Sequence, residues 1–390
     1  MSDFSVEKFL QELEEAVNID SGSHDIAGLN NVADWFEKKY KDTGFFVRRL
    51  SLPDFEGRGD RPYLIAVTAD ISEYLDAPPA DEKPIDILFF GHIDTVYPEG
   101  TASERPFRIE GDRAYGPGAA DMKAGDLLSC YIISELRERY PDKIFAIANN
   151  GDEELGSVDS ESTLAKVAGL AKYAFCMEPG RISGNMVKER KDVAELEVIF
   201  HGISSHAGNS PQKGASAISE MAHFITEVEK LNDFEKGLTV SAGVCEGGSA
   251  VNVISDIAST RLDIRYWKKE DGEALMEKIY RILDNPVNDR VSIERRIISD
   301  MPPMELTPGT QLLVELVSKQ AEKLGQTVGF ESSAGGSDAS YVSGTGLPVL
   351  DACGPCGDFL HNEKEYLVIS SIKERFDLIT GTCIDLLERN

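Results

Sequence analysis

The chain has 390 residues, 41% of them hydrophobic, so it is long enough for two or three domains, each with its own core. Its 68 Asp and Glu residues outnumber 40 Lys and Arg residues, and the net charge of −28 disfavours binding to nucleic acid or to an anionic membrane. Six irregularly spaced cysteines argue against a disulfide framework. The N-terminal segment has a helical, acidic pattern that is unlike a signal peptide, and no run of ~20 apolar residues occurs. These features predict a cytoplasmic protein.

The first half of the chain alternates between helix and strand patterns. Apolar residues at helical spacing predict helices at 6–17 and 26–43, the second ending at Gly44. The alternation that follows predicts an α/β sheet covered by helices. The further elements expected here are strands 45–50, 63–68 and 85–90, helix 123–140, and strands 143–149 and 173–177.

After Pro179 the pattern changes to the order β-α-β-β-α-β, which is typical of a ferredoxin-like α+β domain. Helices 309–324 and 370–387 then return to the first pattern. We therefore predict a catalytic domain in two parts, 1–189 and 304–390, with a lid domain inserted at 190–303. The elements expected in the insert are strand 192–202, helix 215–231, strands 238–244 and 252–267, helix 270–283 and strand 291–298.

Acidic residues and histidines follow several of the predicted strands or tight glycine loops. Because ligands collect beyond the carboxyl ends of strands in an open α/β sheet, we expect these side chains to converge in one crevice. Each signal is weak alone, whereas the ordered set is specific. The set consists of Gly91-His92-Ile93-Asp94, Ala120-Asp121-Met122-Lys123, Gly151-Asp152-Glu153-Glu154, Met177-Glu178-Pro179 and the late histidine His361.

This ordered set resembles the co-catalytic zinc peptidase superfamily. That superfamily includes glutamate carboxypeptidase of the folate-hydrolysing type, acetylornithine deacetylase, succinyl-diaminopimelate desuccinylase and aminoacylase. The resemblance covers nearly the whole chain and is closest to the glutamate carboxypeptidase branch. It implies an α/β fold with a zinc-peptidase-type mixed sheet flanked by helices. It also implies an inserted domain that serves as lid and dimerisation domain of a homodimer.

The resemblance further implies two zinc ions per subunit, with cobalt or manganese as substitutes. His92, Asp121 and Glu178 would bind one ion, and Asp121, Glu154 and His361 the other, so that Asp121 bridges the two. The residue types agree with this assignment, because imidazole and carboxylate groups are good zinc ligands. The charges agree as well, since two zinc ions balance the three carboxylates and a hydroxide.

Two further residues near the ligands receive roles from the resemblance. Glu153 would be the general base, because it adjoins a ligand without being one. Asp94 would hold the ring of His92, as carboxylates behind metal-bound histidines do. The peptide bond between Asp121 and Met122 is expected to be cis.

In the later part of the chain, four residues match positions that the superfamily uses to bind substrate. His206 would polarise the scissile carbonyl, with Asn252 beside it, although Ser, Asn and Gly are also common in helix-capping loops. Arg265 would bind the substrate carboxylate with its guanidinium fork, although a surface arginine would look the same. Gly336 lies in a Gly-Gly-Ser-Asp loop that would supply backbone N–H groups.

The predicted function is zinc-dependent hydrolysis of an amide bond by a metal-bridging hydroxide, releasing a C-terminal amino acid, with glutamate foremost, from a peptidyl or acyl group. Deacylation of N-acyl amino acids is the close alternative, and a non-catalytic metal-binding protein is another. Cys353 and Cys356 spell Cys-Gly-Pro-Cys, which is typical of thiol-disulfide oxidoreductases, but the residues that follow indicate a loop, where that motif needs a helix. The expected partner is a small peptide or N-acyl amino acid, and neither nucleic acid nor a membrane.

Overall fold

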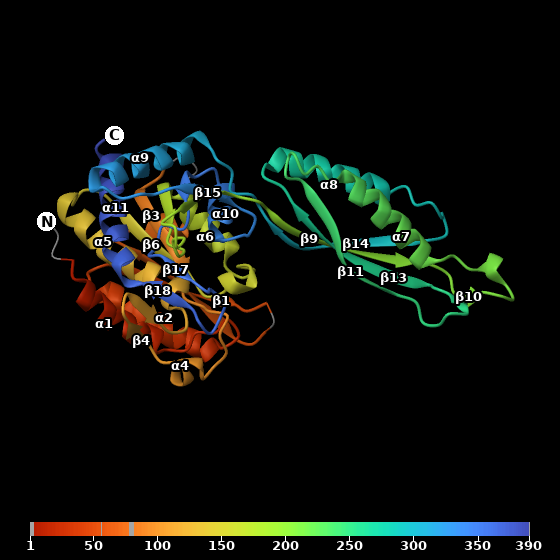
Figure 1. Ribbon diagram of the computed structural model, residues 1–390, viewed down its shortest axis with the longest axis horizontal. Coiled ribbons are helices and arrows are strands. Elements are labelled where there is room, and N and C mark those ends of the chain that lie inside the picture. Colours follow the sequence, from red (N-terminus) through yellow and green to blue (C-terminus); the bar gives the residue numbers. More distant parts are fainter. Residues whose placement is uncertain (1–3, 56, 78–81, 390) are drawn as a thin grey trace. The chain divides into compact units, whose positions relative to one another are not determined.

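A computed structural model describes residues 4–55, 57–77 and 82–389 (Figure 1). The chain divides into two compact units. It leaves the first after Lys188 and returns at Leu306, whereas the sequence predicted borders at 189/190 and 303/304. The Gly-rich loop also differs from expectation, because it groups with the second unit, where Arg190 donates hydrogen bonds to the carbonyls of Gly335 and Gly336. The first unit comprises Met1–Lys188, Leu306–Ser332 and Ser337–Asn390, and the second comprises Glu189–Glu305 and Ser333–Gly336.

The first unit is built on a six-stranded mixed sheet in the order β1-β2-β6-β3-β7-β16. β2 is antiparallel to both of its neighbours, whereas β6, β3, β7 and β16 run parallel. Every residue of β3 is buried, as expected for a central parallel strand. The strands are β1 (Phe46–Pro53), β2 (Asp60–Val67), β3 (Ile85–His92), β6 (Phe145–Asn150), β7 (Ala171–Cys176) and β16 (Val349–Leu350).

Helices flank this sheet, as Figure 1 shows. Ile87 and Phe89 of β3 belong to the main core, which they share with residues of α1, α2, α5, α9 and α11. Leu88 and Phe90 point to the opposite face and are also buried, so both faces are covered. The helices are α1 (Val6–Val17), α2 (Ile26–Asp42), α3 (Ser72–Asp76), α4 (Thr101–Glu104), α5 (Ala124–Arg139), α6 (Glu161–Gly169), α9 (Pro308–Leu324), α10 (Asp338–Gly344) and α11 (Ile369–Leu387).

A small antiparallel sheet, β17-β18-β5-β4, completes the first unit and carries the turn of His361 between β17 and β18. A further pair, β8 and β15, lies where the chain passes between the units. Among the described helices, none has the length and apolarity to cross a membrane. The strands are β4 (Arg108–Glu110), β5 (Arg113–Tyr115), β8 (Met186–Arg190), β15 (Phe330–Ser333), β17 (Gly357–Asp358) and β18 (Tyr366–Val368).

The second unit is a four-stranded antiparallel sheet in the order β11-β13-β9-β14, and α7 and α8 share its core. This topology is the ferredoxin-like fold that the sequence predicted. Alternate residues of β9 are buried, because helices cover only one face. The elements are β9 (Val193–His201), α7 (Ala217–Val228), β11 (Thr239–Gly247), β13 (Ile257–Arg265), α8 (Lys269–Leu283) and β14 (Ser292–Met301).

One predicted strand of the second unit is divided in the structure. The sequence indicated a continuous strand at 252–267, but β12 (Val253–Ile254) and β13 are separate. The hydroxyl of Ser255 donates a hydrogen bond to the carbonyl of Ile257, which turns the backbone between them. β12 pairs instead with the short strand β10 (Ser205–His206).

Candidate metal centre

The carboxyl ends of three neighbouring strands deliver the acidic and histidine side chains to one place. His92 ends β3, Glu153 and Glu154 follow β6 in the 3-10 turn η2 (Glu153–Leu155), and Glu178 lies two residues beyond β7. Because these strands run parallel, their carboxyl ends meet at the same edge of the sheet. Asp121 comes from a turn, η1 (Ala119–Lys123), that leads into α5.

Asp121 lies between the two histidines. One of its carboxylate oxygens is 3.3 Å from Nε2 of His92, and the other is 3.2 Å from Nε2 of His361. Nε2 of His361 is also 3.1 Å from a carboxylate oxygen of Glu154, and Nε2 of His92 is 3.6 Å from one of Glu178. A carboxylate that faces two imidazoles in this way can bridge two cations. The peptide bond from Asp121 to Met122 is cis, which confirms the prediction.

Glu153 lies inside the same cluster. The side chains form two groups, and within each group the ligand atoms all lie within 4.8 Å of one another. One group is His92, Asp121 and Glu154, and the other is His92, Glu153 and Glu178. By distance alone Glu153 could therefore be a ligand as well as a base. Burial raises the pKa of Glu153 well above the usual range, and the nearby Asp338 charge acts in the same direction.

Asp94 holds several parts of the centre in place. It is fully buried, and one of its carboxylate oxygens is 3.3 Å from Nδ1 of His92. The same carboxylate accepts hydrogen bonds from the backbone N–H groups of Glu153 and Glu154, each at 3.2 Å. The hydroxyl of Ser23 donates to it at 2.8 Å. Nδ1 of His92 is also 3.0 Å from the backbone carbonyl of Asp94, so Asp94 fixes the His92 ring with both its backbone and its side chain, and the turn of both glutamates with the side chain.

The carboxylates and histidines alter one another's protonation. Burial opposes the charge on His92, yet hydrogen bonds to Asp121 and Asp94 outweigh it and raise the pKa of His92 well above its ordinary value. Hydrogen bonds to Asp121 and Glu154 raise the pKa of His361 to about 10. The carboxylates thus favour positive charge on the two histidines. A bound metal cation would supply positive charge at the same place and would stabilise the ionised carboxylates.

This residue set fits a pair of divalent cations. Imidazole nitrogens and carboxylate oxygens are the ligands that zinc takes in catalytic sites. His92 turns Nε2 towards the carboxylates while Asp94 holds its Nδ1 side, which is the arrangement of metal-binding histidines. Asp121 offers one oxygen to each side.

The second unit carries the residues predicted to contact substrate. His206 and Asn252 are exposed and lie side by side, because the N–H of Ala207 donates to the carbonyl of Asn252 at 2.9 Å. Nδ1 of His206 accepts hydrogen bonds from the N–H groups of Gly208 and Asn209, each at 3.1 Å. A neutral His206 with this acceptor carries its proton on Nε2.

Arg265 and Gly336 already make contacts within the second unit. The guanidinium of Arg265 binds the carboxylate of Asp263 through Nε and Nη2, and its Nη1 donates to the carbonyl of Ala334 at 3.2 Å. A side chain at Gly336 would meet Met301, since a Cβ placed there lies 2.4 Å from the sulfur. A larger residue at this position would therefore require the Met301 side chain to move.

The match to known families covers most of the chain. Residues 88–384 match the sequence model of Peptidase family M20/M25/M40. The chain belongs to this family. It is a hydrolase, and enzymes of the M20 family are typically dependent on two zinc ions, in agreement with the cluster around Asp121.

Relatives of the M20 chain include proteins of different named activities. Carboxypeptidase G2 of Pseudomonas sp. (strain RS-16) is 28% identical over 393 residues, covering 97% of this chain and 89% of that protein. Succinyl-diaminopimelate desuccinylase of Hydrogenovibrio crunogenus is 27% identical over 326 residues, covering 77% and 84%. Among solved structures, the aminopeptidase PepT from Bacillus cereus ATCC 10987 has a TM-score of 0.75 at 23% identity, covering 98% of this chain and 99% of that chain. The structural likeness supports the fold.

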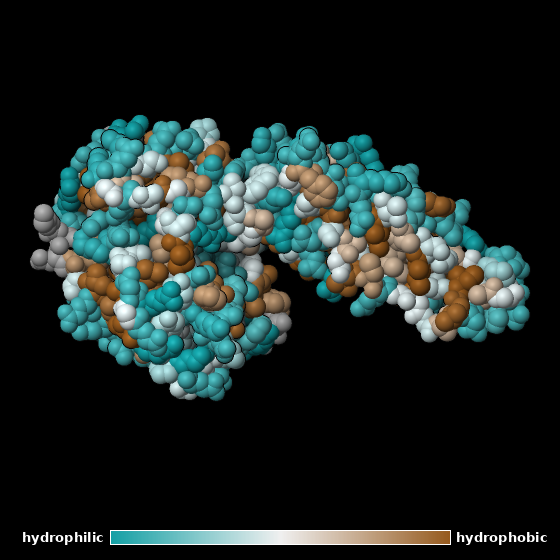
Figure 2. Space-filling model, viewed as in Figure 1, coloured by the Kyte–Doolittle hydropathy of each residue, from teal (hydrophilic) through white to brown (hydrophobic). Residues whose placement is uncertain are grey.

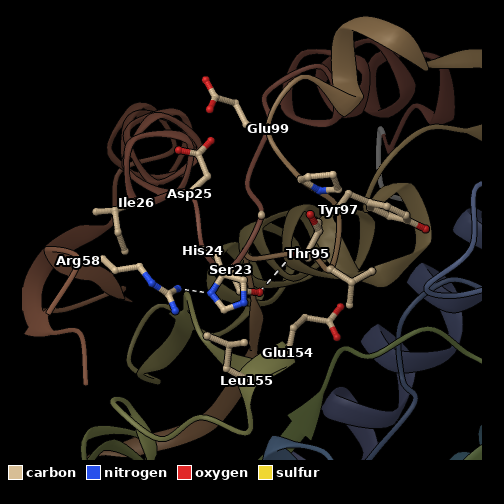
Figure 3. Close-up of a pocket in the computed structure, with 13 residues that line it drawn as sticks. Ser23, His24, Asp25, Ile26, Arg58, Thr95, Tyr97, Glu99, Glu154 and Leu155 are labelled. Carbon is tan, nitrogen blue, oxygen red and sulfur yellow. Dashed lines mark hydrogen bonds between the residues drawn. The ribbon is translucent and has the colours of Figure 1, made fainter. Parts of the chain in front are cut away.

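A cavity of about 600 Å³ opens beside the metal centre of this M20 enzyme (Figure 3). Glu154 forms part of its wall, so the cavity adjoins the cluster directly. Figure 3 shows Ile26 and Leu155 on one side, together with Arg58, which contacts His24. The wall combines apolar and polar groups, as small-molecule sites do.

The Cys-Gly-Pro-Cys segment has none of the features of a redox site. Cys353 is fully buried, and burial raises the pKa of its thiol well above the usual value. The segment leads into the strand β17, whereas the redox motif needs a helix. All six cysteines are free, and the chain is a hydrolase. The burial of Cys353 and the family membership therefore count against the oxidoreductase alternative.

Sequence reasoning missed four residues that support the centre. Ser23 binds Asp94, and Arg61, which is 1% exposed, donates to the carbonyls of Ser23 and Gly151. Arg61 gave no signal in the sequence, because it stands between Asp60 and Pro62, ahead of the predicted strand 63–68. Tyr97 and Glu365 bind each other with an oxygen–oxygen distance of 2.8 Å. Glu365 had one signal, namely its place four residues after His361.

Proposed function

We propose that this M20 enzyme releases a C-terminal amino acid from an acyl or peptidyl group by hydrolysing an amide bond. The observation that carries the proposal is Asp121, whose two oxygens face His92 and His361. His92, Asp121 and Glu178 would hold one zinc ion, and Asp121, Glu154 and His361 the other. When bound, the two ions polarise the amide carbonyl and lower the pKa of a water.

Glu153 is the proposed general base. It removes a proton from the attacking water and delivers that proton to the leaving nitrogen. Two observations support the role, because the backbone N–H of Glu153 is anchored to Asp94 and its carboxylate oxygen is 3.9 Å from Nε2 of His92. The side chain is thus held at the ligands.

His206 is the proposed donor to the carbonyl oxygen of the amide. Because Nδ1 accepts from two N–H groups, the ring proton lies on Nε2, which is then a hydrogen-bond donor. Asn252, which directly precedes the adjoining strand β12, adds a second polar group. Arg265 and the loop of Gly336 are the proposed contacts of the substrate carboxylate.

We further propose that the enzyme acts as a homodimer through the second unit. β11 is an edge strand of its sheet and is largely exposed. Figure 2 shows apolar surface on this unit, and exposed residues there include Ile218, Val244 and Val251. An exposed edge with apolar side chains favours pairing with a second copy.

The cavity beside Glu154 supports an acyl group larger than acetyl. Its volume of about 600 Å³ exceeds the needs of a two-carbon group, and it adjoins the ligand cluster. This observation favours the carboxypeptidase over a deacetylase. Glutamate is the first amino acid to test, because the motifs resemble the glutamate carboxypeptidase branch and one relative is named carboxypeptidase G2.

The test is a substrate panel with the zinc-loaded enzyme. N-benzoyl and peptidyl derivatives of glutamate and of other amino acids are compared with the N-acetyl and N-succinyl derivatives. We expect the highest kcat/KM for large acyl groups on glutamate. Preference for N-acetyl or N-succinyl substrates would favour the deacylase, and zinc uptake without turnover of any amide would favour a binding protein.

A variant pair tests the cavity in the same panel. Ile26→Trp should fill the cavity and lower kcat/KM for N-benzoyl substrates more than for N-acetyl substrates. Ile109→Trp is the control, because Ile109 is 49% exposed on β4 and does not line the cavity. Equal losses for both acyl groups in Ile26→Trp would reject the cavity as the acyl site.

A further inference from the structure

Glu365 lies in the same turn as the ligand His361 and is 3% exposed. Its carboxylate accepts hydrogen bonds from three backbone N–H groups of the Asp121 loop, at 2.9 Å from Ala120, 3.1 Å from Asp121 and 3.3 Å from Gly118. The hydroxyl of Tyr97 donates to it at 2.8 Å. A buried carboxylate with four donors is well satisfied.

The Asp121 loop is shaped to surround this carboxylate. Gly118 has a φ of +73°, a left-handed conformation that turns its N–H towards the same point as those of Ala120 and Asp121. Backbone N–H groups of one loop that converge in this way form a concave anion site. Here Glu365 of the chain itself fills that concavity, and so the loop is tied to a residue 244 positions away.

The turn of His361 needs hydrogen bonds from distant residues to hold its shape. The ligands His92 and Glu178 need them less, because they lie at the ends of sheet strands. His361 and Phe359 have φ values of +60° and +55°, which residues other than glycine adopt only when their surroundings hold them. The hydroxyl of Tyr97 also donates to the carbonyl of Asn362, at 2.7 Å. By contrast, His92 ends β3 and Glu178 follows two residues after β7, and both strands are paired within the sheet.

We propose that Glu365 is a positioning residue that joins the Asp121 loop to the His361 turn. It thereby sets the affinity for the metal ion shared by Asp121, Glu154 and His361, while the affinity for the other ion does not depend on it. The inference rests on the proposed two-metal centre. Carboxylates behind metal ligands typically contribute about 10–100-fold to metal affinity.

The experiment is a Co²⁺ titration of the metal-free full-length protein, followed by calorimetry and by visible absorption. The wild type should take up two Co²⁺ ions per chain. In Glu365→Gln, which keeps the shape but loses the charge, one of the two affinities should fall about 10–100-fold and the other should stay unchanged. Tyr97→Phe, which leaves the carboxylate in place, should weaken the same affinity by a smaller factor.

A double variant identifies the affected ion. His361→Ala removes one ligand of the ion in question, so the Co²⁺ that still binds tightly is the one held by His92 and Glu178. Adding Glu365→Gln to His361→Ala should leave that remaining affinity unchanged. A further loss there would overturn the assignment to the His361 side.

The matched control is Glu220→Gln in the second unit. Glu220 is 4% exposed and accepts hydrogen bonds from the N–H groups of Val287 and Asn288, so it resembles Glu365 without lying near the ligands. It should leave both Co²⁺ affinities unchanged while lowering the melting temperature.

The outcomes separate this inference from the proposed function. If Glu365→Gln binds both Co²⁺ ions as tightly as the wild type, or if both affinities fall equally, the positioning role is overturned. The two-metal centre would still stand. Uptake of fewer than two Co²⁺ ions by the wild type would overturn the two-metal centre and this inference together. If Glu365→Gln does not fold, unchanged Co²⁺ affinities in Tyr97→Phe overturn the role.

Discussion

The two units of this M20 enzyme present their proposed functional groups in opposite ways. In the first unit Asp94 is fully buried, and its carboxylate contacts His92, Ser23 and the turn of two glutamates. In the second unit His206 is exposed, and the hydrogen bonds to its ring come from N–H groups two and three residues away. In the first unit, hydrogen bonds between distant segments hold the side chains of the site in place. In the second unit, His206 is held only by neighbouring residues, and its exposed ring is free to contact another molecule.

The difference indicates a division of labour. Metal ligands need fixed geometry, and long-range hydrogen bonds supply it before any ligand arrives. Groups that contact the substrate gain by remaining accessible until it binds. Variants in the first unit should therefore act on kcat and metal affinity, and those in the second on the contacts made with substrate or a second copy.

The largest effect is expected from Glu153→Gln. Loss of the base should lower kcat by about 10²–10⁴-fold while both zinc ions stay bound, because the amide keeps the size of the side chain and removes proton transfer. Steady-state kinetics and zinc analysis of the same sample measure this. Loss of zinc from the variant would show instead that Glu153 is a ligand, as its distance to Glu178 and His92 permits.

His206→Ala should lower kcat by about 10²–10³-fold, since it removes one donor to the developing oxyanion. Zinc content should not change, in contrast to ligand variants of the first unit. Mixing inactive His206→Ala with inactive Glu153→Gln should restore part of the activity if the histidine serves the site of the other subunit. No recovery after proven subunit exchange would reject action across a dimer.

A smaller effect is expected from Arg265→Ala. Loss of a charged hydrogen bond to the substrate carboxylate should lower kcat/KM by about 10–100-fold, mainly through KM. Asp263→Asn, which weakens the competing pair with Arg265, should lower KM. Arg261→Ala on the same strand is the control, because Arg261 pairs with Glu197 and is exposed. An equal rise of KM in both arginine variants would count against a specific contact.

The smallest effect concerns stability and its dependence on pH. Burial raises the pKa of Asp192 in the second unit to about 8, and one of its oxygens has no partner within the described part of the chain. A raised carboxyl pKa stabilises the fold fully below the unfolded pKa of about 4 and loses that contribution as pH rises to 8. Asp192→Asn should therefore raise the melting temperature more at pH 9 than at pH 5, and a pH-independent difference would contradict this.

The sequence by itself predicted most of the elements, and the resemblance to a zinc peptidase family named the candidate residues of the centre. Apolar spacing placed helices such as α1 and α11, and the β-α-β-β-α-β order predicted the ferredoxin-like unit. Histidines and acids after parallel strands, such as His92 and Glu178, predicted where ligands gather. These signals are local, because periodicity and position at a strand end can be read within a few residues.

Only the tertiary structure decided what holds those residues in place. Ser23 reaches Asp94 across 71 positions, and Tyr97 reaches Glu365 across 268. The tertiary structure also pairs Arg265 with Asp263 and places the loop of Gly336 in the second unit. A hydrogen bond between distant segments leaves no period or spacing in the sequence, since it depends on how the layers pack and which donors the folded backbone turns inward.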